Sequence, residues 1–141
     1  KDSTGQSTIS SRVRFIDGGA ALVGHAASSD AAFSSVKRLM GRTFEEARHV
    51  TTVGALFFAN MEQLSHSSGV GLRCESSNQI YEPQQVASEV LVALLARSEA
   101  ACGVPAQRAV ICVPAHFDQP QRAATLEAAE RAGIKKVRLL E

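Results

Sequence analysis

Aromatic residues are scarce in this chain: there is no tryptophan, and phenylalanine and tyrosine together make up only 5% of its 141 positions. Few aromatic side chains leave few platforms on which nucleobases can stack. An excess of one charge is also lacking, because 15 Lys and Arg residues stand against 14 Asp and Glu, which gives a net charge of +1. A protein that mainly neutralises nucleic acid phosphates needs a clear cationic excess. Composition therefore argues against nucleic acid as a partner.

Long apolar runs and a cysteine framework are absent as well. No run approaches the ~18–20 apolar residues that span a bilayer, and residues 1–10 lack the apolar segment of a secretory signal. We therefore expect a soluble protein with no membrane partner. Cys74, Cys102 and Cys112 show no C-x-x-C spacing, and the last two have apolar sequence neighbours. This predicts reduced thiols in the cytoplasm or an organelle matrix.

The residues that are present suit one globular unit. Hydrophobic residues make up 45% and charged residues 21%, as in an ordinary soluble domain. A length of 141 residues corresponds to about one domain. The sequence begins at Lys1 without methionine and ends at Glu141 directly after a strand-like run. We expect a piece of a longer protein.

Alternation of polar and apolar residues predicts two β-hairpins in the first half. Residues 12–16 and 20–23 flank turn residues, and residues 69–74 are followed by a turn-rich stretch and a returning strand at 79–81. Residues 50–64 mix β-branched and helix-favouring residues, and no single period fits them.

Local helix signals lie between the two hairpins. Residues 29–40 have a partly helical pattern, and Gly41 can end that turn in the left-handed conformation. Thr43 and Glu46 have the T-x-x-E spacing of a capping box. A short helix is predicted to begin there.

The strongest helix signal opens the second half. Pro83 suits the first turn of a helix that ends near Gly103. Its apolar stripe consists of Val86, Val90, Leu91, Leu94 and Leu95.

A βαβ unit is predicted next. Residues 109–113 form an apolar run typical of a strand buried on both faces. Asp118 can cap a helix with Pro120 in its first turn and Gly133 at its end, and a strand follows over residues 136–140. The crossover of such a unit is right-handed.

No local motif for hydrolysis or metal binding is found. The histidines at 25, 49, 66 and 116 lack H-E-x-x-H or Cys/His spacing, so we expect no metal site. There is no G-x-S-x-G elbow. The G-x-G at residues 69–71 precedes a strand, which favours a bend over a phosphate loop.

Basic residues gather in two groups, Lys37, Arg38 and Arg42, and then Arg131, Lys135, Lys136 and Arg138. Each group can be a solvated face. For the first group, the alternative is a lysine facing a phosphoryl group, because an ammonium offsets its charge without bidentate geometry.

Four ordered blocks are distinctive: STISSRVRFIDGGAALVGHAA at 7–27, FSSVKRLMGR at 33–42, YEPQQVASEVLVALL at 81–95, and AVICVPAHFDQPQRAATLEAAERAGIKKVRLLE at 109–141. Together they resemble the nucleotide-binding domain of the seventy-kilodalton heat-shock (DnaK-type) chaperones, with little resemblance over 46–68. The resemblance implies an α/β (mixed α+β) chain of actin-like ATPase, or ribonuclease H-like, fold. Residues 1–141 would form part of lobe I of one nucleotide-binding domain. The family's D-L-G-T-T and E-P-T-A-A-A phosphate loops are expected before Lys1 and after Glu141.

The resemblance also implies roles for four residues. Lys37 matches the catalytic lysine that reaches the γ-phosphate, Pro114 the proline switch, Arg122 the arginine relay, and Arg138 an arginine that docks J-domain co-chaperones. Simpler interpretations stay open: Lys37 facing solvent, Pro114 ending a strand, and Arg122 as a cation on a helix face.

The implied function is that of an ATP-dependent molecular chaperone, in which ATP binding and hydrolysis control the binding of unfolded polypeptide. ATP or ADP with Mg²⁺ would be the cofactor of the intact ATPase, and we expect the fragment to bind it weakly and to be inactive. Expected partners are J-domain co-chaperones, a nucleotide exchange factor and unfolded clients, the last through a substrate-binding domain outside this chain. The alternative is a non-catalytic chaperone-like module that docks co-chaperones through the face from Arg131 to Arg138.

Several positions depart from the family pattern. His116 stands where tyrosine is usual, which can perturb the coupling or make it pH-sensitive. Ile9, His25 and Pro120 replace a proline, an aspartate and a small polar residue. Glu141 aligns with a residue that is usually asparagine, so no catalytic role is assigned to it.

Overall fold

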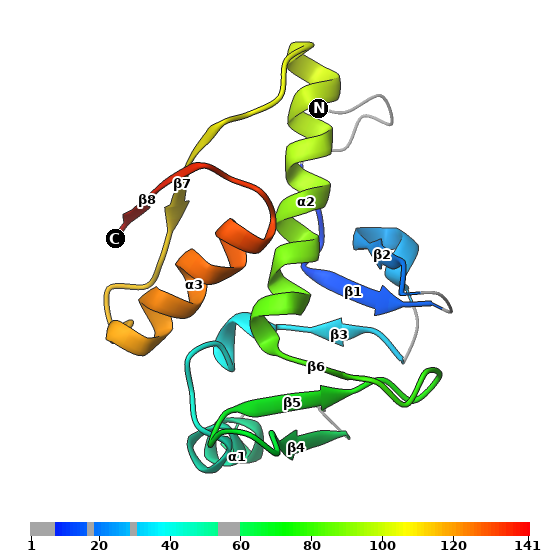
Figure 1. Cartoon of the computed structure of the whole chain (residues 1–141), viewed down its shortest axis with the longest axis vertical. Coiled ribbons are helices and arrows are strands. Elements are labelled where there is room, and N and C mark those ends of the chain that lie inside the picture. Colours follow the sequence, from blue (N-terminus) through cyan, green and yellow to red (C-terminus); the bar gives the residue numbers. More distant parts are fainter. Residues whose placement is uncertain (1–7, 17–18, 29–30, 54–59) are drawn as a thin grey trace.

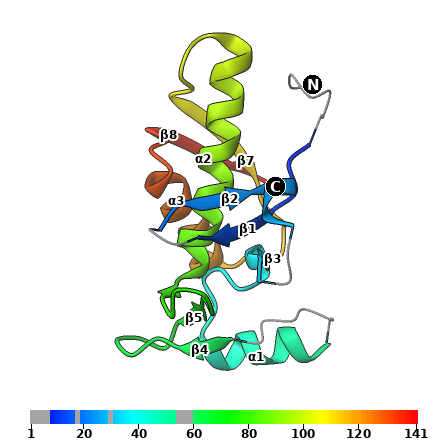
Figure 2. The ribbon, with the colours of Figure 1, turned by 90° about the vertical axis from the view of Figure 1, so that its right-hand side faces the viewer.

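The computed structural model describes residues 8–16, 19–28, 31–53 and 60–141, with side chains as far as residue 50 in the third range. Within these ranges, three small sheets are arranged around one long helix, α2 (Pro83–Cys102). In Figures 1 and 2, α2 stands in the middle with the second sheet and α1 near its lower end. The mixed α/β class expected from the sequence is confirmed. No helix among the described residues is long and apolar enough to cross a bilayer.

The first sheet contains β1 (Arg12–Phe15), β2 (Ala21–Val23) and β3 (Phe33–Ser34), in the order β2-β1-β3 with antiparallel neighbours. A short 3-10 helix, η1 (Gly24–Ala27), follows β2. The first predicted hairpin is confirmed, although its turn residues 17 and 18 lie outside the described residues. The helical interpretation of 29–40 is wrong at β3, because pairing with β1 holds this segment extended, and residues 29 and 30 are outside the described part. Only η2 (Val36–Arg38) is helical, as a single 3-10 turn.

The second sheet contains β4 (Met61–Gln63), β5 (Val70–Arg73) and β6 (Ile80–Tyr81). Its β5–β6 pair confirms the second predicted hairpin. The helix before it, α1 (Phe44–Val53), begins with the predicted capping box: the Thr43 amide donates to Glu46 Oε2 at 2.8 Å, and the Glu46 amide donates to Thr43 Oγ1 at 3.3 Å. The ambiguous stretch 50–64 holds the end of α1 and β4, and residues 54–59 lie outside the described part.

The βαβ unit is confirmed. Parallel strands β7 (Arg108–Cys112) and β8 (Lys136–Leu140) are joined through α3 (Gln119–Arg131). Asp118 caps α3, its Oδ1 accepting from the Gln121 amide at 2.9 Å. Gly103 ends α2 with a φ of 73°.

The prediction that residues 109–113 are buried on both faces is wrong. Burial alternates along both strands, and Val110 is 62% exposed. Among the described residues this sheet has two strands and packs one face toward α3, and a continuous apolar run does not show whether one face or both faces are covered. Leu94 of the α2 stripe is also 45% exposed.

All three cysteines are free, in agreement with the predicted reduced thiols. Cys102, at the end of α2, and Cys112, at the end of β7, are exposed, whereas Cys74 is buried. Burial raises the pKa of the Cys74 thiol, but hydrogen bonds with Ser76 and Ser77 outweigh it, and the pKa lies below its ordinary value.

Helix α2 contacts both hydrophobic clusters. The larger cluster joins the first two sheets and includes Val13, Phe15, Leu39, Leu72 and Val86. The Phe15 and Tyr81 rings stack there with centroids 3.7 Å apart. The smaller cluster joins α3 to α2 through Met40, Ala124 and Ala128, with Ala87 and Leu91 packed against it. Because α2 is shared, it fixes the βαβ unit relative to the other two sheets.

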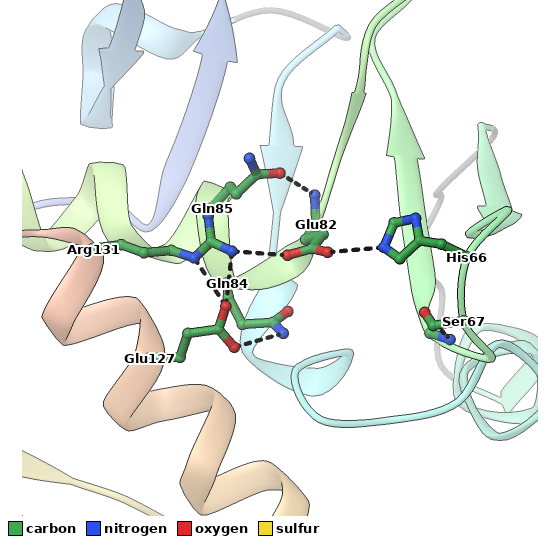
Figure 3. A network of polar contacts seen from close by, with 8 residues as sticks. His66, Ser67, Glu82, Gln84, Gln85, Glu127 and Arg131 are labelled. Atoms are coloured by element: carbon green, nitrogen blue, oxygen red, sulfur yellow. Dashed lines mark hydrogen bonds and ion pairs between the residues drawn. The ribbon is translucent and has the colours of Figure 1, made fainter.

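A polar network adds a second connection between these parts (Figure 3). Arg131 Nη2 on α3 lies 3.2 Å from Glu82 Oε2 and 2.8 Å from Glu127 Oε1. Glu82 Oε1, at the start of α2, lies 3.8 Å from His66 Nε2 in the loop between β4 and β5. Arg131 therefore has two carboxylate partners, although its side chain stays exposed as predicted for the basic group that it shares with Arg138.

Candidate functional site

A cleft of about 770 Å³ lies where the first sheet, η2 and the start of α3 meet. Its lining comes from segments that are far apart in the sequence: Ser10, Ser11, Arg12, Ser34, Ser35, Lys37, Arg38, Arg42, Val50, Pro114, His116, Phe117 and Gln121. The βαβ unit therefore forms one wall and the N-terminal elements form the other.

Lys37 and Pro114 lie in this same cleft. Lys37 Nζ donates to the Cys112 carbonyl at 3.3 Å and lies 5.8 Å from the centroid of the Phe117 ring. Cys112 is the last residue of β7, so the ammonium is held at the carboxyl end of that strand, two residues before Pro114. Lys37 is exposed, and it faces the cleft through these contacts.

Gly41 brings the two walls together. Its φ is +70°, and a Cβ atom built on it would lie 2.5 Å from the backbone of Pro120 and Gln121. A side chain would therefore clash with the first turn of α3, and the left-handed backbone itself favours glycine. The sequence predicted the turn at Gly41 but not this close approach, which no local pattern reveals.

Arg122 does not line the cleft, but it contacts the loop that does. Its Nε donates to the Phe117 carbonyl at 2.9 Å, and its Nη2 donates to Glu141 Oε1 at 2.6 Å. A weaker contact joins Nη2 to the Ala115 carbonyl at 3.5 Å. The guanidinium thus connects α3 to the loop after Pro114 and to the residue that follows β8.

Arg138 does not line the cleft. It is exposed on β8, where its Cα partner across the sheet is Val110 of β7. The structure therefore brings Lys37 and Pro114 together, places Arg122 beside them, and leaves Arg138 on the outer face of the βαβ unit.

His116 lines the cleft beside Pro114, with its ring edge-on to Phe117 at a centroid distance of 5.9 Å. His25 and His49 are exposed elsewhere on the surface. Among the described residues, no group of three or more histidine, cysteine, aspartate or glutamate side chains is placed to hold a metal ion.

The charged side chains that line the described part of the cleft are all positive. Arg12, Lys37, Arg38 and Arg42 line it, and among the described residues of the lining there is no carboxylate. The last three are close together in the sequence, whereas Arg12 joins them only in the folded chain. The alternation over residues 12–16 indicated which face of the strand Arg12 occupies, but not that β3 and η2 pass beside it.

Comparison with known proteins agrees with this picture. The family model described as Hsp70 protein matches residues 1–141. The chain is 37% identical over 145 residues to the Chaperone protein HscA homolog of Azoarcus sp. (strain BH72). It is 38% identical over 146 residues to that of Azotobacter vinelandii (strain DJ / ATCC BAA-1303). In each case the match covers 99% of this chain and 22% of the relative.

The chain therefore belongs to the Hsp70 family, and the resemblance seen in its four blocks is confirmed. Both relatives are chaperones by name, and the chain spans about a fifth of their length.

Proposed function

We propose that this chain is part of the ATPase domain of an ATP-dependent chaperone, in which nucleotide binding and hydrolysis control the binding of unfolded polypeptide. The observation that supports it most directly is the shared cleft of Lys37 and Pro114 in a chain of the Hsp70 family. Two elements distant in sequence supply these residues, as a nucleotide-driven switch requires.

Lys37 would act on the phosphate end of the nucleotide. Its ammonium, held by the Cys112 carbonyl, can offset the negative charge that develops on a transferring phosphoryl group. The bound ATP supplies the phosphoryl group itself. The charged residues that line the described part of the cleft are cations, and their role would be to neutralise phosphate.

Pro114 and Arg122 would couple the nucleotide-bound state of the cleft to the position of α3 and the end of β8. Proline ends the β7 ladder and restricts the residue before it, which favours discrete arrangements of this loop. Arg122 holds the same loop through the Phe117 carbonyl and also reaches Glu141. A change in the position of Pro114 would therefore alter the contacts of Arg122 with this loop and with Glu141, and so move α3 or the end of β8.

The remaining expectations belong to the same proposal. We infer that residues 1–141 form part of lobe I of an actin-like ATPase domain whose phosphate loops lie in other parts of the protein. Partners would be J-domain co-chaperones at Arg138, a nucleotide exchange factor and unfolded clients, in the cytoplasm or an organelle matrix.

The test is single-turnover and steady-state ATP hydrolysis by the full-length protein that contains this chain. Lys37→Ala should lower kcat by about 10²-fold, the usual loss for one charge-stabilising donor, and should largely spare ATP affinity. Lys135→Ala, an exposed lysine just before β8, is the matched control and should hydrolyse ATP normally. Unchanged turnover in Lys37→Ala would remove Lys37 from the mechanism, and failure of the full-length protein to bind ATP would refute the proposal.

A further inference from the structure

We propose that the ion pair of Glu82 and Arg131 is a latch between α2 and α3, and that this latch positions the wall of the cleft to which α3 contributes. Glu82 precedes the first residue of α2, and Arg131 is the last residue of α3 (Figure 3). The inference goes beyond the proposed function, because it concerns how the cleft is held and does not depend on what the cleft binds. Arg131 would be a positioning residue, since it does not line the cleft itself.

Glu82 lies at a junction of the chain. It follows β6 of the second sheet and precedes Pro83, the first residue of α2. Its backbone amide donates to Gln85 Oε1 at 2.7 Å, and its side chain is only 24% exposed. This carboxylate is therefore held in place by its own surroundings. A side chain that binds it is tied to α2 and to the second sheet at the same time.

Arg131 is directed to this junction by its own helix. Its Nε donates to Glu127 Oε1 at 2.9 Å, one helical turn earlier, and Glu127 Oε2 accepts from Gln84 Nε2 at 3.3 Å. Arg131 Nη2 lies 3.2 Å from Glu82 Oε2. Two polar contacts thus cross from the end of α3 to the start of α2. The planar guanidinium suits this arrangement, because it presents several donors in a fixed geometry to two carboxylates.

The packed surface of α3 consists of small side chains. Ala124 and Ala128, one turn apart, are buried against Met40 and against Ala87 and Leu91 of α2. Alanine ends at Cβ, so these residues form low ridges that interlock weakly with a neighbouring helix. Such a contact can accommodate a small slide or rotation of α3, which is the shear motion of packed helices. The polar contacts at the end of the helix then restrict its angle.

The other end of α3 belongs to the cleft. Gln121 lines it, and a Cβ built on Gly41 would lie 2.5 Å from the backbone of Pro120 and Gln121, so the first turn of α3 touches the opposite wall. Gln121 and Arg131 are about 15 Å apart along the helix axis, at a rise of about 1.5 Å per residue. Release of Arg131 would let α3 turn about the contact at Gly41 and would move Gln121. The latch is therefore coupled to the cleft wall through one rigid helix.

Hydrogen–deuterium exchange of the full-length protein without nucleotide tests this inference. In the wild type, the amides of Gly133 and Ile134 after α3 and those of Phe117 and Arg122 near its start all donate to backbone carbonyls. Arg131→Gln should raise exchange about 2- to 5-fold in peptides from both ends, the size expected for loss of an exposed ion pair. A contact with a local role alone would raise exchange only at the end of the helix.

Further variants separate the latch from a general change of charge. Glu82→Gln should give the same pattern, and the double variant Glu82→Gln/Arg131→Gln should exchange no faster than Arg131→Gln, because both changes break one contact. Arg131→Lys replaces the planar group by a single ammonium and should fall between wild type and Arg131→Gln. Glu45→Gln is the matched control: it removes the 3.5 Å ion pair with Arg48 inside α1 and should leave exchange in α3 unchanged.

Circular dichroism melts should show that every variant folds, and should Arg131→Gln not fold, Arg131→Lys carries the same test. The inference is overturned if exchange does not rise at the start of α3, if the effects of Glu82→Gln and Arg131→Gln add, or if Glu45→Gln acts as strongly. None of these outcomes bears on the ATPase proposal, which depends on the turnover of Lys37→Ala. Normal turnover in Lys37→Ala, in turn, leaves the latch intact.

Discussion

At the scale of single residues, two glycines share a backbone conformation but not an environment. Gly41 and Gly103 have φ values of +70° and +73°. A Cβ at Gly41 would lie 2.5 Å from the α3 backbone, whereas a Cβ at Gly103 would meet nothing within 4 Å. The pair therefore separates the cost of the left-handed backbone from the cost of steric contact.

We predict that Gly41→Ala destabilises the chain much more than Gly103→Ala. The left-handed backbone costs about 1–2 kcal/mol at either position, and only Gly41→Ala must also push α3 away from η2. Urea denaturation of both variants measures the difference in the free energy of unfolding. Equal losses would show that the walls of the cleft can separate freely at this point.

The residues of the site were predictable to different degrees. Lys37 and Pro114 lie in motifs that a single sequence displays, V-K-R-L-M-G-R and V-P-A-H-F, and the structure places them in one cleft. Arg12 was missed because its place in the cleft depends on which strand pairs with β1. The catalytic and switching roles stay predictions until the kinetic test is done.

At the scale of elements, helix ends are set by short-range chemistry. Asp118 and Gln121 exchange two hydrogen bonds at the start of α3, of 2.9 and 3.1 Å. Gln121 also lines the cleft, so this cap joins helix stability to the geometry of the site.

Loss of this cap should destabilise the chain modestly. Asp118→Ala removes the acceptor for the Gln121 amide and should cost about 1 kcal/mol. Asp118→Ser, which keeps an acceptor, should recover most of that loss. Thermal or chemical denaturation measures both variants, and an Asp118→Ala variant as stable as wild type would mean that the cap contributes nothing.

Caps could be read from the sequence because the partners are three residues apart. The box at Thr43 has the same spacing, and the ends of α2 and α3 were marked by glycines, Gly103 and Gly133, which take the left-handed conformation. Strand β3 was mistaken for helix because its extended conformation is imposed by β1, which lies about twenty residues earlier. The exposure of β7 was also missed, since an apolar run does not reveal how many layers cover it.

At the scale of the whole molecule, the outer face of the βαβ unit carries exposed apolar side chains. Val110 and Leu140 on this face are 62% and 46% exposed, beside the cations Arg108, Lys136 and Arg138. Apolar side chains on a two-stranded sheet with open edges favour association between copies.

We expect the 141-residue chain to self-associate through this face as its concentration rises. Val110→Lys should shift sedimentation toward monomer, because it adds charge to the centre of the apolar patch. Val104→Lys is the control, since Val104 is 63% exposed but lies in the loop after α2. If both substitutions act equally, overall charge rather than this face governs association.

Of the global architecture, the mixed α/β class and the βαβ unit followed from periodicity, and the family followed from ordered motifs. The arrangement of the sheets around α2 could not be predicted from the sequence, because it depends on contacts between distant segments, such as that of Phe15 with Tyr81.

The stacked Phe15 and Tyr81 rings also constrain how the molecule is made. A ribosome releases the chain N-terminus first, and Phe15 emerges long before the strand that covers it. Until Tyr81 and the start of α2 have been translated, the nascent first sheet cannot close its apolar face. A member of the Hsp70 family thus passes through its own synthesis with one apolar face of a sheet uncovered.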